Sequence, residues 1–284
     1  MNVKFRALFS VLLLAAVSAL SLSAQETLRI ATFNNQYENK VHPWADRADR
    51  VYMLIEAENW DIVGMQEPFW NQMADMDAKL TQYGWIGNST DGKIEDGYWH
   101  YNPIFYRKAR LEMLDWGRFW FSETPDVPGS KSWDSHTSRF CVWGHFRDRV
   151  SGRDFYHFNV HYDHKGETAR RESSRLLLAR IAAVAAGKPY FVTGDFNTEE
   201  GTPAYDILVD AGLTDAFFAA PVRTGDRIAS WNDWKPMLRV EEPSNLDHVF
   251  ISPGTKALSW RLVITKFGGE YPSDHFPITV EWQY

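Results

Sequence analysis

A short apolar run at residues 189–192 leads directly into Thr193-Gly194-Asp195-Phe196-Asn197. A run of this length predicts a buried strand. Because side chains alternate along a strand, Asp195 and Asn197 are delivered to the same side of its end. A carboxylate and a carboxamide placed in this way suit the binding of a phosphate group or of the water that attacks it. Asp and Asn are also ordinary turn residues, so the stretch alone leaves both readings open.

The same pattern, an apolar run that ends at a polar residue, recurs along the chain. Alternating or short apolar runs predict strands over 28–33, 62–65, 103–107, 139–146, 154–160, 246–252, 258–265 and 276–282. Helical periodicity predicts helices over 44–58, 68–80, 168–186 and 203–209. The polar residues at the strand ends are Asn34, Glu67, His161, Asp195, Asn197, Asp247, His248, Asp274 and His275.

The single cysteine, Cys141, cannot form an internal disulfide, so a hydrophobic core must hold the fold of this 284-residue chain. Residues 1–24 have the pattern of a secretory signal peptide, with Lys4 and Arg6 before an apolar run and small residues after it. The apolar run is too short to span a membrane. We therefore expect a secreted or periplasmic protein in which residues 25–284 form one domain, without a transmembrane segment, as a monomer.

The negative net charge of the chain limits the class of ligand that it can bind. The whole chain carries a formal charge of −7, and removal of the signal segment would take away two basic residues and no acidic ones. Such a surface is unfavourable for holding a long polyanion. It favours a phosphorylated small molecule or a phospholipid head group over long nucleic acid. The 13 tryptophans suit a thick core between sheets, or a substrate groove.

The residue types at the strand ends are those needed for water attack on phosphorus. Carboxylate and carboxamide oxygens are hard ligands, which suit Mg²⁺ and also Mn²⁺ or Ca²⁺. An imidazole can polarise water or protonate a leaving group near neutral pH. A bound cation stabilises the phosphate charge during an in-line displacement.

Taken in order, these motifs resemble the endonuclease/exonuclease/phosphatase superfamily of divalent-metal phosphohydrolases. The resemblance spans the chain after residue 24, and each motif alone is unspecific. It implies a four-layer α/β/β/α sandwich, in which two mixed β-sheets pack face to face between helices and the site lies at the sheet tops. The motifs are 31–34 (Ala-Thr-Phe-Asn), 66–67 (Gln-Glu), 159–161 (Asn-Val-His), 194–197 (Gly-Asp-Phe-Asn), 246–247 (Leu-Asp) and 273–275 (Ser-Asp-His).

The resemblance also implies roles for individual residues. Glu67 is similar to the principal metal ligand of the family, and Asn34 and Asp274 would contribute directly or through water. A solvated strand-end carboxylate and a turn asparagine are the structural alternatives for Glu67 and Asn34.

His275 is similar to the catalytic histidine of the family, with Asp247 as the carboxylate that orients its ring. Asp195 and Asn197 would position the attacking water and a phosphate oxygen. The general base differs between branches of the family, so the choice between Asp195 and His275 stays open.

His161, in the Asn-x-His motif, resembles the branch of pancreatic-type deoxyribonucleases, neutral sphingomyelinases, deadenylases and inositol polyphosphate phosphatases. It would bind phosphate or act as a general acid, unless it is a buried structural histidine. Arg139 is a candidate for bidentate phosphate binding, with a surface ion pair as the alternative. His164 and His248 are expected to support the site or to lie at the surface.

Two further segments leave a structural and a functional interpretation open. Residues 99–101 (Trp-His-Tyr) would pack in the core or in a strand pair, or stack on a sugar, base or head group. Residues 122–138, rich in Pro, Gly, Ser and Asp, predict a long surface loop that is either a functional lid or a variable connection.

These observations predict a secreted, metal-dependent phosphohydrolase that cleaves a phosphodiester or a phosphomonoester by in-line water attack. Two alternatives stay open. One is a non-specific secreted nuclease of the same fold. The other is a non-catalytic protein that binds an anionic ligand, although such a protein has no need of a general base.

Overall fold

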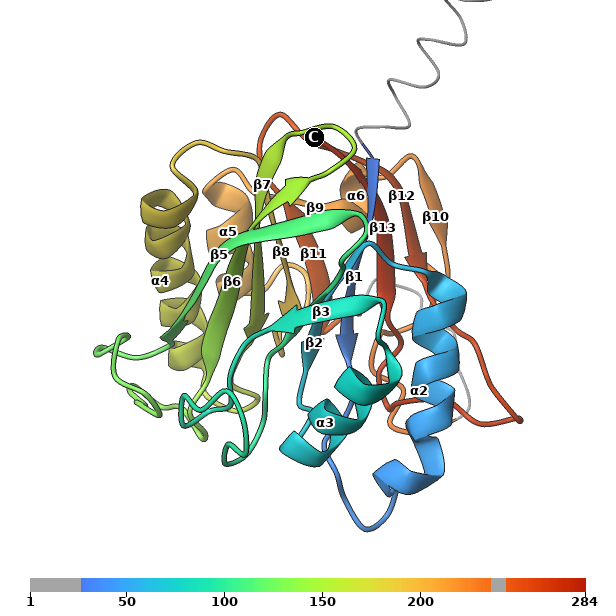
Figure 1. Cartoon of the computed structure of the whole chain (residues 1–284). Helices are drawn as coiled ribbons and strands as arrows, with labels where there is room; N and C mark the ends of the chain where they lie inside the picture. The colour runs from blue at the N-terminus through green and yellow to red at the C-terminus, as the bar shows by residue number, and fades with distance from the viewer. Residues whose placement is uncertain (1–26, 236–243) are drawn as a thin grey trace, which may run out of the picture.

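The computed structural model describes residues 27–235 and 244–284. Two β-sheets pack face to face, and helices cover the outer side of each sheet (Figure 1). This arrangement confirms the expected four-layer α/β/β/α sandwich. The predicted signal peptide lies outside the described residues. Within those residues no helix is long and apolar enough to cross a membrane.

The first sheet has seven strands in the order β10-β12-β13-β1-β2-β4-β3. It is mixed, because β1 pairs in parallel with β2 and antiparallel with β13. The C-terminal ends of β1 and β2 therefore lie at the same edge of the sheet. The strands are β1 (Thr27–Asn34), β2 (Ile62–Gln66), β3 (Tyr83–Ile86), β4 (Ile104–Arg107), β10 (Val222–Thr224), β12 (Lys256–Leu262) and β13 (Ile278–Gln283).

The second sheet has six strands in the order β5-β6-β7-β8-β11-β9. It is also mixed, with β7 parallel to β8 and β11 antiparallel to β8. The end of β7, the end of β8 and the beginning of β11 are consequently neighbours. The strands are β5 (Leu111–Trp120), β6 (Phe140–Asp148), β7 (Asp154–His161), β8 (Tyr190–Asp195), β9 (Thr214–Asp215) and β11 (Asp247–Ile251).

The helices form the two outer layers (Figure 1). Helices α2 (Trp44–Glu58) and α3 (Trp70–Lys79) pack on the seven-stranded sheet through a cluster that includes Val51, Ile55 and Met73. Helices α4 (Glu167–Ala185) and α5 (Pro203–Asp210) pack on the six-stranded sheet through Leu177 and Leu208, among others. The predicted helices agree with these bounds to within two residues. The short α6 (Ala216–Ala219), β9 and β10 were not predicted.

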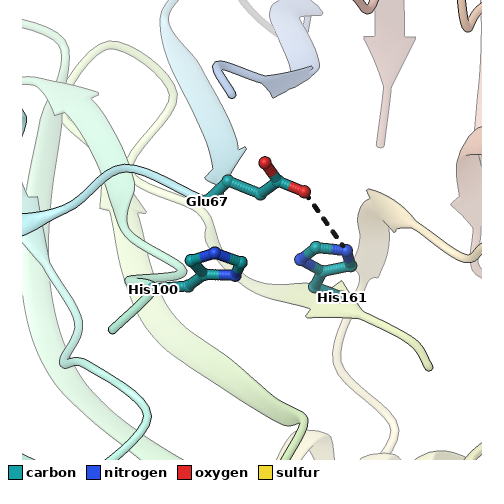
Figure 2. A group of neighbouring side chains, drawn as sticks. All are labelled: Glu67, His100 and His161. Carbon is teal, nitrogen blue, oxygen red and sulfur yellow. Dashed lines mark ion pairs between the residues drawn. The ribbon is translucent and has the colours of Figure 1, made fainter. Parts of the chain in front are cut away.

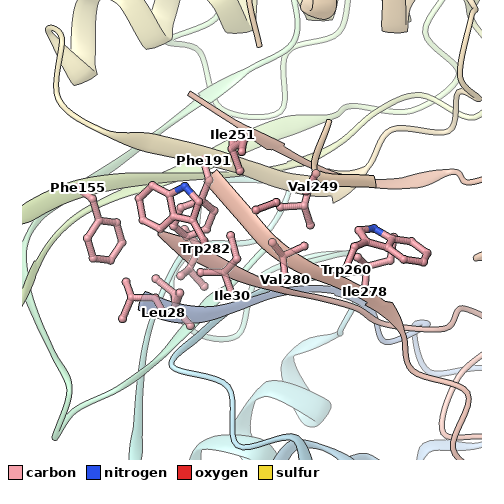
Figure 3. Packing of buried hydrophobic residues seen from close by; sticks show 14 of the residues in the cluster. Leu28, Ile30, Phe155, Phe191, Val249, Ile251, Trp260, Ile278, Val280 and Trp282 are labelled. Atoms are coloured by element: carbon pink, nitrogen blue, oxygen red, sulfur yellow. The ribbon is translucent and has the colours of Figure 1, made fainter. Parts of the chain in front are cut away.

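The core between the sheets follows from the alternation of side chains along the strands. Leu28 and Ile30 of β1 point into the space between the sheets, whereas Ala31 and Phe33 face the helices. Trp282 of β13 and Phe191 of β8 meet across this space, with ring centroids 4.9 Å apart (Figure 3). The apolar part of the core therefore lies at the level of the first residues of β1. It is separate from the strand ends that carry the polar residues.

A layer of buried polar side chains lies between the apolar core and the strand ends that carry the site residues. Gln66 donates from Nε2 to Oδ1 of Asn159 (2.7 Å), and Thr193 donates from Oγ1 to the same oxygen (3.1 Å). Asn159 donates from Nδ2 to the backbone oxygen of Met65 (2.8 Å). Gln66 lies on one sheet and Asn159 and Thr193 on the other, and all three are fully buried. Their hydrogen bonds join the two sheets just below the strand ends.

Gly64 allows the sheets to approach at this layer. A Cβ at position 64 would lie 2.2 Å from Oγ1 of Thr193 and 2.4 Å from Oδ1 of Asn159. These distances are far inside van der Waals contact, so any side chain here would push the two sheets apart.

His248 anchors the second sheet behind the site. Its Nδ1 lies 3.0 Å from Oδ2 of Asp215, and its Nε2 lies 2.9 Å from the backbone oxygen of Thr198. Both partners are acceptors, so both ring nitrogens must donate and the imidazole is a cation. Burial opposes this charge, but the hydrogen bond to Asp215 outweighs it and raises the pKa of His248 to about 9.

This pair predicts a loss of stability at alkaline pH. The pKa of His248 is higher in the folded chain than in the unfolded one, so its stabilisation is complete below about pH 6.5 and is lost as the pH rises through about 9. The pKa difference corresponds to a free energy of unfolding on the order of 3 kcal/mol. Urea unfolding at pH 6.5 and pH 9.5, for the wild type and for His248→Gln, measures it.

The variant serves as the control because every other titrating group is common to both proteins. His248→Gln should be less stable than the wild type at pH 6.5, and the difference should shrink at pH 9.5. An unchanged difference between the two pH values would show that His248 does not carry a charge in the folded protein.

Candidate active site

Three site residues lie in one row across the six-stranded sheet. Asp195 at the end of β8 is the register partner of His161 on β7 and of Asp247 on β11. Because neighbours in register point to the same face of a sheet, all three side chains enter the space between the sheets. Asn34, at the end of β1, enters it from the opposite sheet and donates from Nδ2 to Oδ2 of Asp195 (2.9 Å).

Asp195 is a buried carboxylate with few donors. The backbone N–H of Asn197 donates to its Oδ1 (2.9 Å), and Asn197 has a positive φ of 48°, which turns the chain back toward the carboxylate. Burial, followed by the neighbouring Asp247, raises the pKa of Asp195 to about 7. A carboxylate with this pKa can accept a proton near neutral pH, as a general base must.

His275 links two of these carboxylates. Its Nδ1 lies 2.8 Å from Oδ2 of Asp247, and its Nε2 lies 3.9 Å from Oδ2 of Asp195. Burial opposes a charge on the ring, but Asp247 and then Asp195 overcome this effect and raise the pKa of His275 well above its ordinary value. The ring is therefore an imidazolium whose Nε2 faces the cleft.

Glu67 follows β2 and has a positive φ of 77°, a strained conformation for a residue with a side chain. Its Oε2 accepts from the backbone N–H of Tyr37 (3.2 Å). Gln36 connects the neighbouring ligand candidates, because its N–H donates to Oδ1 of Asn34 (3.0 Å) and its Nε2 donates to Oδ2 of Asp274 (2.8 Å). The neighbouring strands β13, β1 and β2 of the seven-stranded sheet thus bring Asp274, Asn34 and Glu67 to one place.

The charges on these residues fit a divalent cation. Burial, followed by repulsion from Asp274, raises the pKa of Glu67, so the carboxylates lack enough positive charge around them. A cation held by the oxygens of Glu67, Asp274 and Asn34 would supply that charge, and oxygen donors suit Mg²⁺, Mn²⁺ or Ca²⁺.

His161 accepts a hydrogen bond from Arg139 at Nε2, so this nitrogen carries no proton of its own. Nη1 of Arg139 lies 2.8 Å from Nε2 of His161, and Nη2 lies 3.2 Å from Nδ1 of His164. Burial and the positive charge of Arg139 lower the pKa values of both histidines, so each ring is neutral and accepts from the guanidinium. Arg139 is itself buried, which excludes the surface ion pair considered from the sequence.

Glu67, His100 and His161 face one another (Figure 2). Their ligand atoms lie within 4.8 Å of one another, close enough for a metal site by distance alone. Oε1 of Glu67 lies 3.9 Å from Nε2 of His161, the nitrogen that accepts from Arg139. The guanidinium charge disfavours a cation at that nitrogen, so Glu67 is better placed to share a cation with Asn34 and Asp274 than with these two histidines.

These side chains line a cleft of about 560 Å³ at the strand ends. Aromatic side chains form its outer walls, and the imidazoles and carboxylates form its floor. The lining residues are Tyr37, Glu67, Trp99, His100, His136, Thr137, Arg139, His161, His164, Asp195, Asn197, Trp231, Leu246 and His275.

The structure thus brings the predicted catalytic and metal-binding residues to one edge of the sandwich, where their chemical roles stay predictions. His164 contacts Arg139 at this edge. His248 does not reach the cleft: it is buried on the helix-covered face of β11, which excludes the surface position and leaves the supporting role that the sequence also allowed.

The segment 99–101 divides between the two interpretations that the sequence left open. Tyr101 is in the core, but Trp99 and His100 line the cleft. His100 lies in a long connection and follows no apolar run, so no local signal decided between the two interpretations. His136, Thr137 and Trp231 were missed for the same reason.

The loop at 122–138 is tied to the site by hydrogen bonds. Oδ2 of Asp163 accepts from the backbone N–H groups of His136 (2.9 Å) and Thr137 (3.0 Å). Asp134 accepts from the backbone N–H of Ala169 (2.6 Å) and so caps the first turn of α4. These contacts hold His136 and Thr137 against the cleft.

Comparison with known proteins agrees with this geometry. An uncharacterized protein of Acanthamoeba polyphaga mimivirus is 32% identical over 274 residues, which cover 87% of this chain and 95% of the relative. The solved structure of a mannosyl-6-phosphatase of Bacteroides thetaiotaomicron is 33% identical, with a TM-score of 0.85, and the match covers 90% of this chain and 100% of that one. The human nocturnin catalytic domain is 18% identical, with a TM-score of 0.69 over 91% of this chain and 93% of that one, and is similar in fold.

The match to a family model decides the classification. The model of the Endonuclease/Exonuclease/phosphatase family matches residues 31–275, which include every strand-end residue described above. This family is generally dependent on a divalent metal, and the described residues include groups of carboxylates and imidazoles that are close enough together to hold an ion. The chain therefore belongs to the endonuclease/exonuclease/phosphatase family of phosphoric ester hydrolases.

Proposed function

We propose that this protein is a divalent-metal-dependent phosphatase that hydrolyses the phosphomonoester of a sugar. The observation that carries the chemistry is the position of Asp195, a buried carboxylate of raised pKa that lies between Asn34 and His275. The similarity to the mannosyl-6-phosphatase supports the substrate class.

Glu67, Asn34 and Asp274 would hold the metal ion. When bound, the ion supplies positive charge to the phosphate oxygens, and Mg²⁺ is the ion we expect. Arg139, fixed between His161 and His164, presents its remaining N–H groups to another phosphate oxygen.

Asp195 takes a proton from water as the water oxygen forms its bond to phosphorus. The bond between phosphorus and the sugar oxygen breaks, and that oxygen takes a proton from solvent water. Asp195 then returns its proton to the solvent, so the products are inorganic phosphate and the free sugar. The charged His275 donates from Nε2 to the phosphate and stabilises negative charge. Its ring cannot turn away, because Asp247 holds Nδ1.

The cleft suits a sugar phosphate better than long nucleic acid. Among the described residues that line it, Arg139 is the one arginine and lysine is absent, whereas Glu67 and Asp195 are acidic. A polyanion requires several cations along its path. The exposed rings of Trp99 and Trp231 instead offer apolar faces on which a sugar ring can pack.

Export to the periplasm or the medium remains part of the proposal, on the basis of the pattern in residues 1–24. N-terminal sequencing of the protein recovered from the periplasm or the medium would test it. A mature protein that still begins at Met1 would contradict it.

Removal of metal should abolish activity. We expect exhaustive chelation to stop the release of phosphate from mannose 6-phosphate, and added Mg²⁺ or Mn²⁺ to restore it, because Glu67, Asn34 and Asp274 then regain their cation. Phosphate release with and without chelator measures the effect.

The same assay compares substrates. Duplex DNA, sphingomyelin and inositol phosphates should be hydrolysed far more slowly than mannose 6-phosphate. Full activity after chelation would overturn the metal requirement. Binding of sugar phosphates without phosphate release under any of these ions would show a binding protein.

The dependence of kcat/KM on pH separates Asp195 from His275 as the base. If Asp195 is the base, kcat/KM falls as the pH drops below its pKa, because the protonated carboxyl cannot accept a proton. Asp195→Asn should lower kcat by about 10²- to 10⁴-fold and remove this acid limb. His275→Gln should also lower kcat but keep the limb.

Asp49→Asn, on the exposed side of α2, is the matched control and should retain wild-type kcat. Circular dichroism of each variant checks the fold. Loss of the acid limb in His275→Gln would reassign the base to that histidine. A fall of less than about tenfold in Asp195→Asn would move the site elsewhere.

A further inference from the structure

We propose that the active cleft continues into a second subsite, which binds the neighbouring sugar of a phosphorylated oligosaccharide. This inference rests on the proposed phosphatase function and names its substrate more closely. The phosphorylated sugar would occupy the cleft over Asp195, and the next sugar would pack on Tyr98.

A second cavity of about 450 Å³ adjoins the active cleft. The two share Trp99, His136 and Thr137, so a ligand can pass from one to the other along Trp99. Tyr98 and Lys131 line the second cavity but not the first. The cleft alone is large enough for one phosphorylated sugar, and the second cavity provides room for another unit.

A series of rings connects the catalytic floor to this cavity. The rings of His161 and His100 are nearly parallel, with centroids 6.2 Å apart and planes at 4°. His100 and Trp99 follow at 4.9 Å and 14°, and Trp99 and Tyr98 at 5.9 Å and 26°. The series begins at the residue that holds Arg139 and ends at the second cavity.

The outer rings of this series are exposed. Trp99 is 39% exposed and Tyr98 is 71% exposed, which is unfavourable for aromatic side chains without a partner. Trp99 also has a positive φ of 70°, a strained conformation that the surrounding contacts must maintain.

Hydrogen bonds hold the connection that carries these two rings. Oδ1 of Asp91 accepts from the backbone N–H of Tyr98 (3.2 Å), and the backbone N–H of Thr90 donates to the backbone oxygen of His100 (2.9 Å). The rings are thus presented in fixed positions before a ligand arrives, which reduces the entropy lost on binding.

The chemistry of the second cavity favours an uncharged, hydroxyl-rich ligand. Its lining has one acidic residue, Asp91, which is paired with Lys93, and one lysine, Lys131, while Thr90, Thr137 and Ser138 offer hydroxyl groups. The C–H face of a sugar ring is apolar and weakly positive, so it packs on the negative face of an aromatic ring. A nucleotide chain would also stack, but it brings phosphates that Lys131 alone cannot balance.

The test compares two substrates and one variant. We expect kcat/KM for a disaccharide that carries a 6-phosphate on one mannose to exceed that for mannose 6-phosphate by roughly three- to tenfold, the gain from one aromatic contact. Tyr98→Ala should remove this gain and leave kcat/KM for mannose 6-phosphate unchanged. Phe218→Ala, which removes another exposed ring (55% exposed) on α6, is the control and should keep the gain.

Binding gives a second readout that does not depend on turnover. The unphosphorylated disaccharide should bind to wild-type protein and bind more weakly to Tyr98→Ala, as titration calorimetry measures. Equal kcat/KM for the two sugar phosphates in the wild type would overturn the subsite and leave the phosphatase proposal standing. Failure to hydrolyse either sugar phosphate would overturn both. A gain at Tyr98 for nucleotides but not for sugars would assign the cavity to a base.

Discussion

The two sheets are joined by a buried hydrogen bond from Nε2 of Gln66 to Oδ1 of Asn159, and the whole site depends on it. A buried amide that loses its partner costs about 1–3 kcal/mol, so Gln66, Asn159 and Thr193 hold one another in a single arrangement. Gly64 lets this layer close, since any side chain there would collide with it. Asn34 of one sheet can therefore reach Asp195 of the other.

Within that frame, the reactivity of the site comes from charges that burial disfavours. Asp195 and Glu67 both have raised pKa values because water is excluded and other carboxylates lie near. His275 and Arg139 provide positive charge in fixed positions, one held by Asp247 and the other by two neutral histidines. A phosphate group with its cation would complete this balance, so its binding would relieve an unfavourable arrangement that the fold maintains.

The sequence predicted what local patterns can encode. The strand ends at Asn34, His161 and Asp195 could be found because each follows an apolar run, and helix α2 matches its predicted bounds because its period is regular. The place of His100 in the cleft could not be decided from the sequence, because a connection of irregular structure brings it there. The sequence could not decide between a supporting and a surface position for His248, because its partner, Asp215, lies on a two-residue strand that has no sequence signal.

The register of β7, β8 and β11 limits how proteins of this fold can change. A one-residue insertion or deletion within β8 would turn Asp195 to the face covered by α4 and α5, because side chains alternate along a strand. Changes of length are therefore tolerated only in the connections. Those connections carry Tyr98, Trp99 and His136, which line the second cavity, where the part of a substrate beyond its phosphate would lie. Insertions and deletions can thus alter the choice of substrate while the hydrolytic chemistry stays constant.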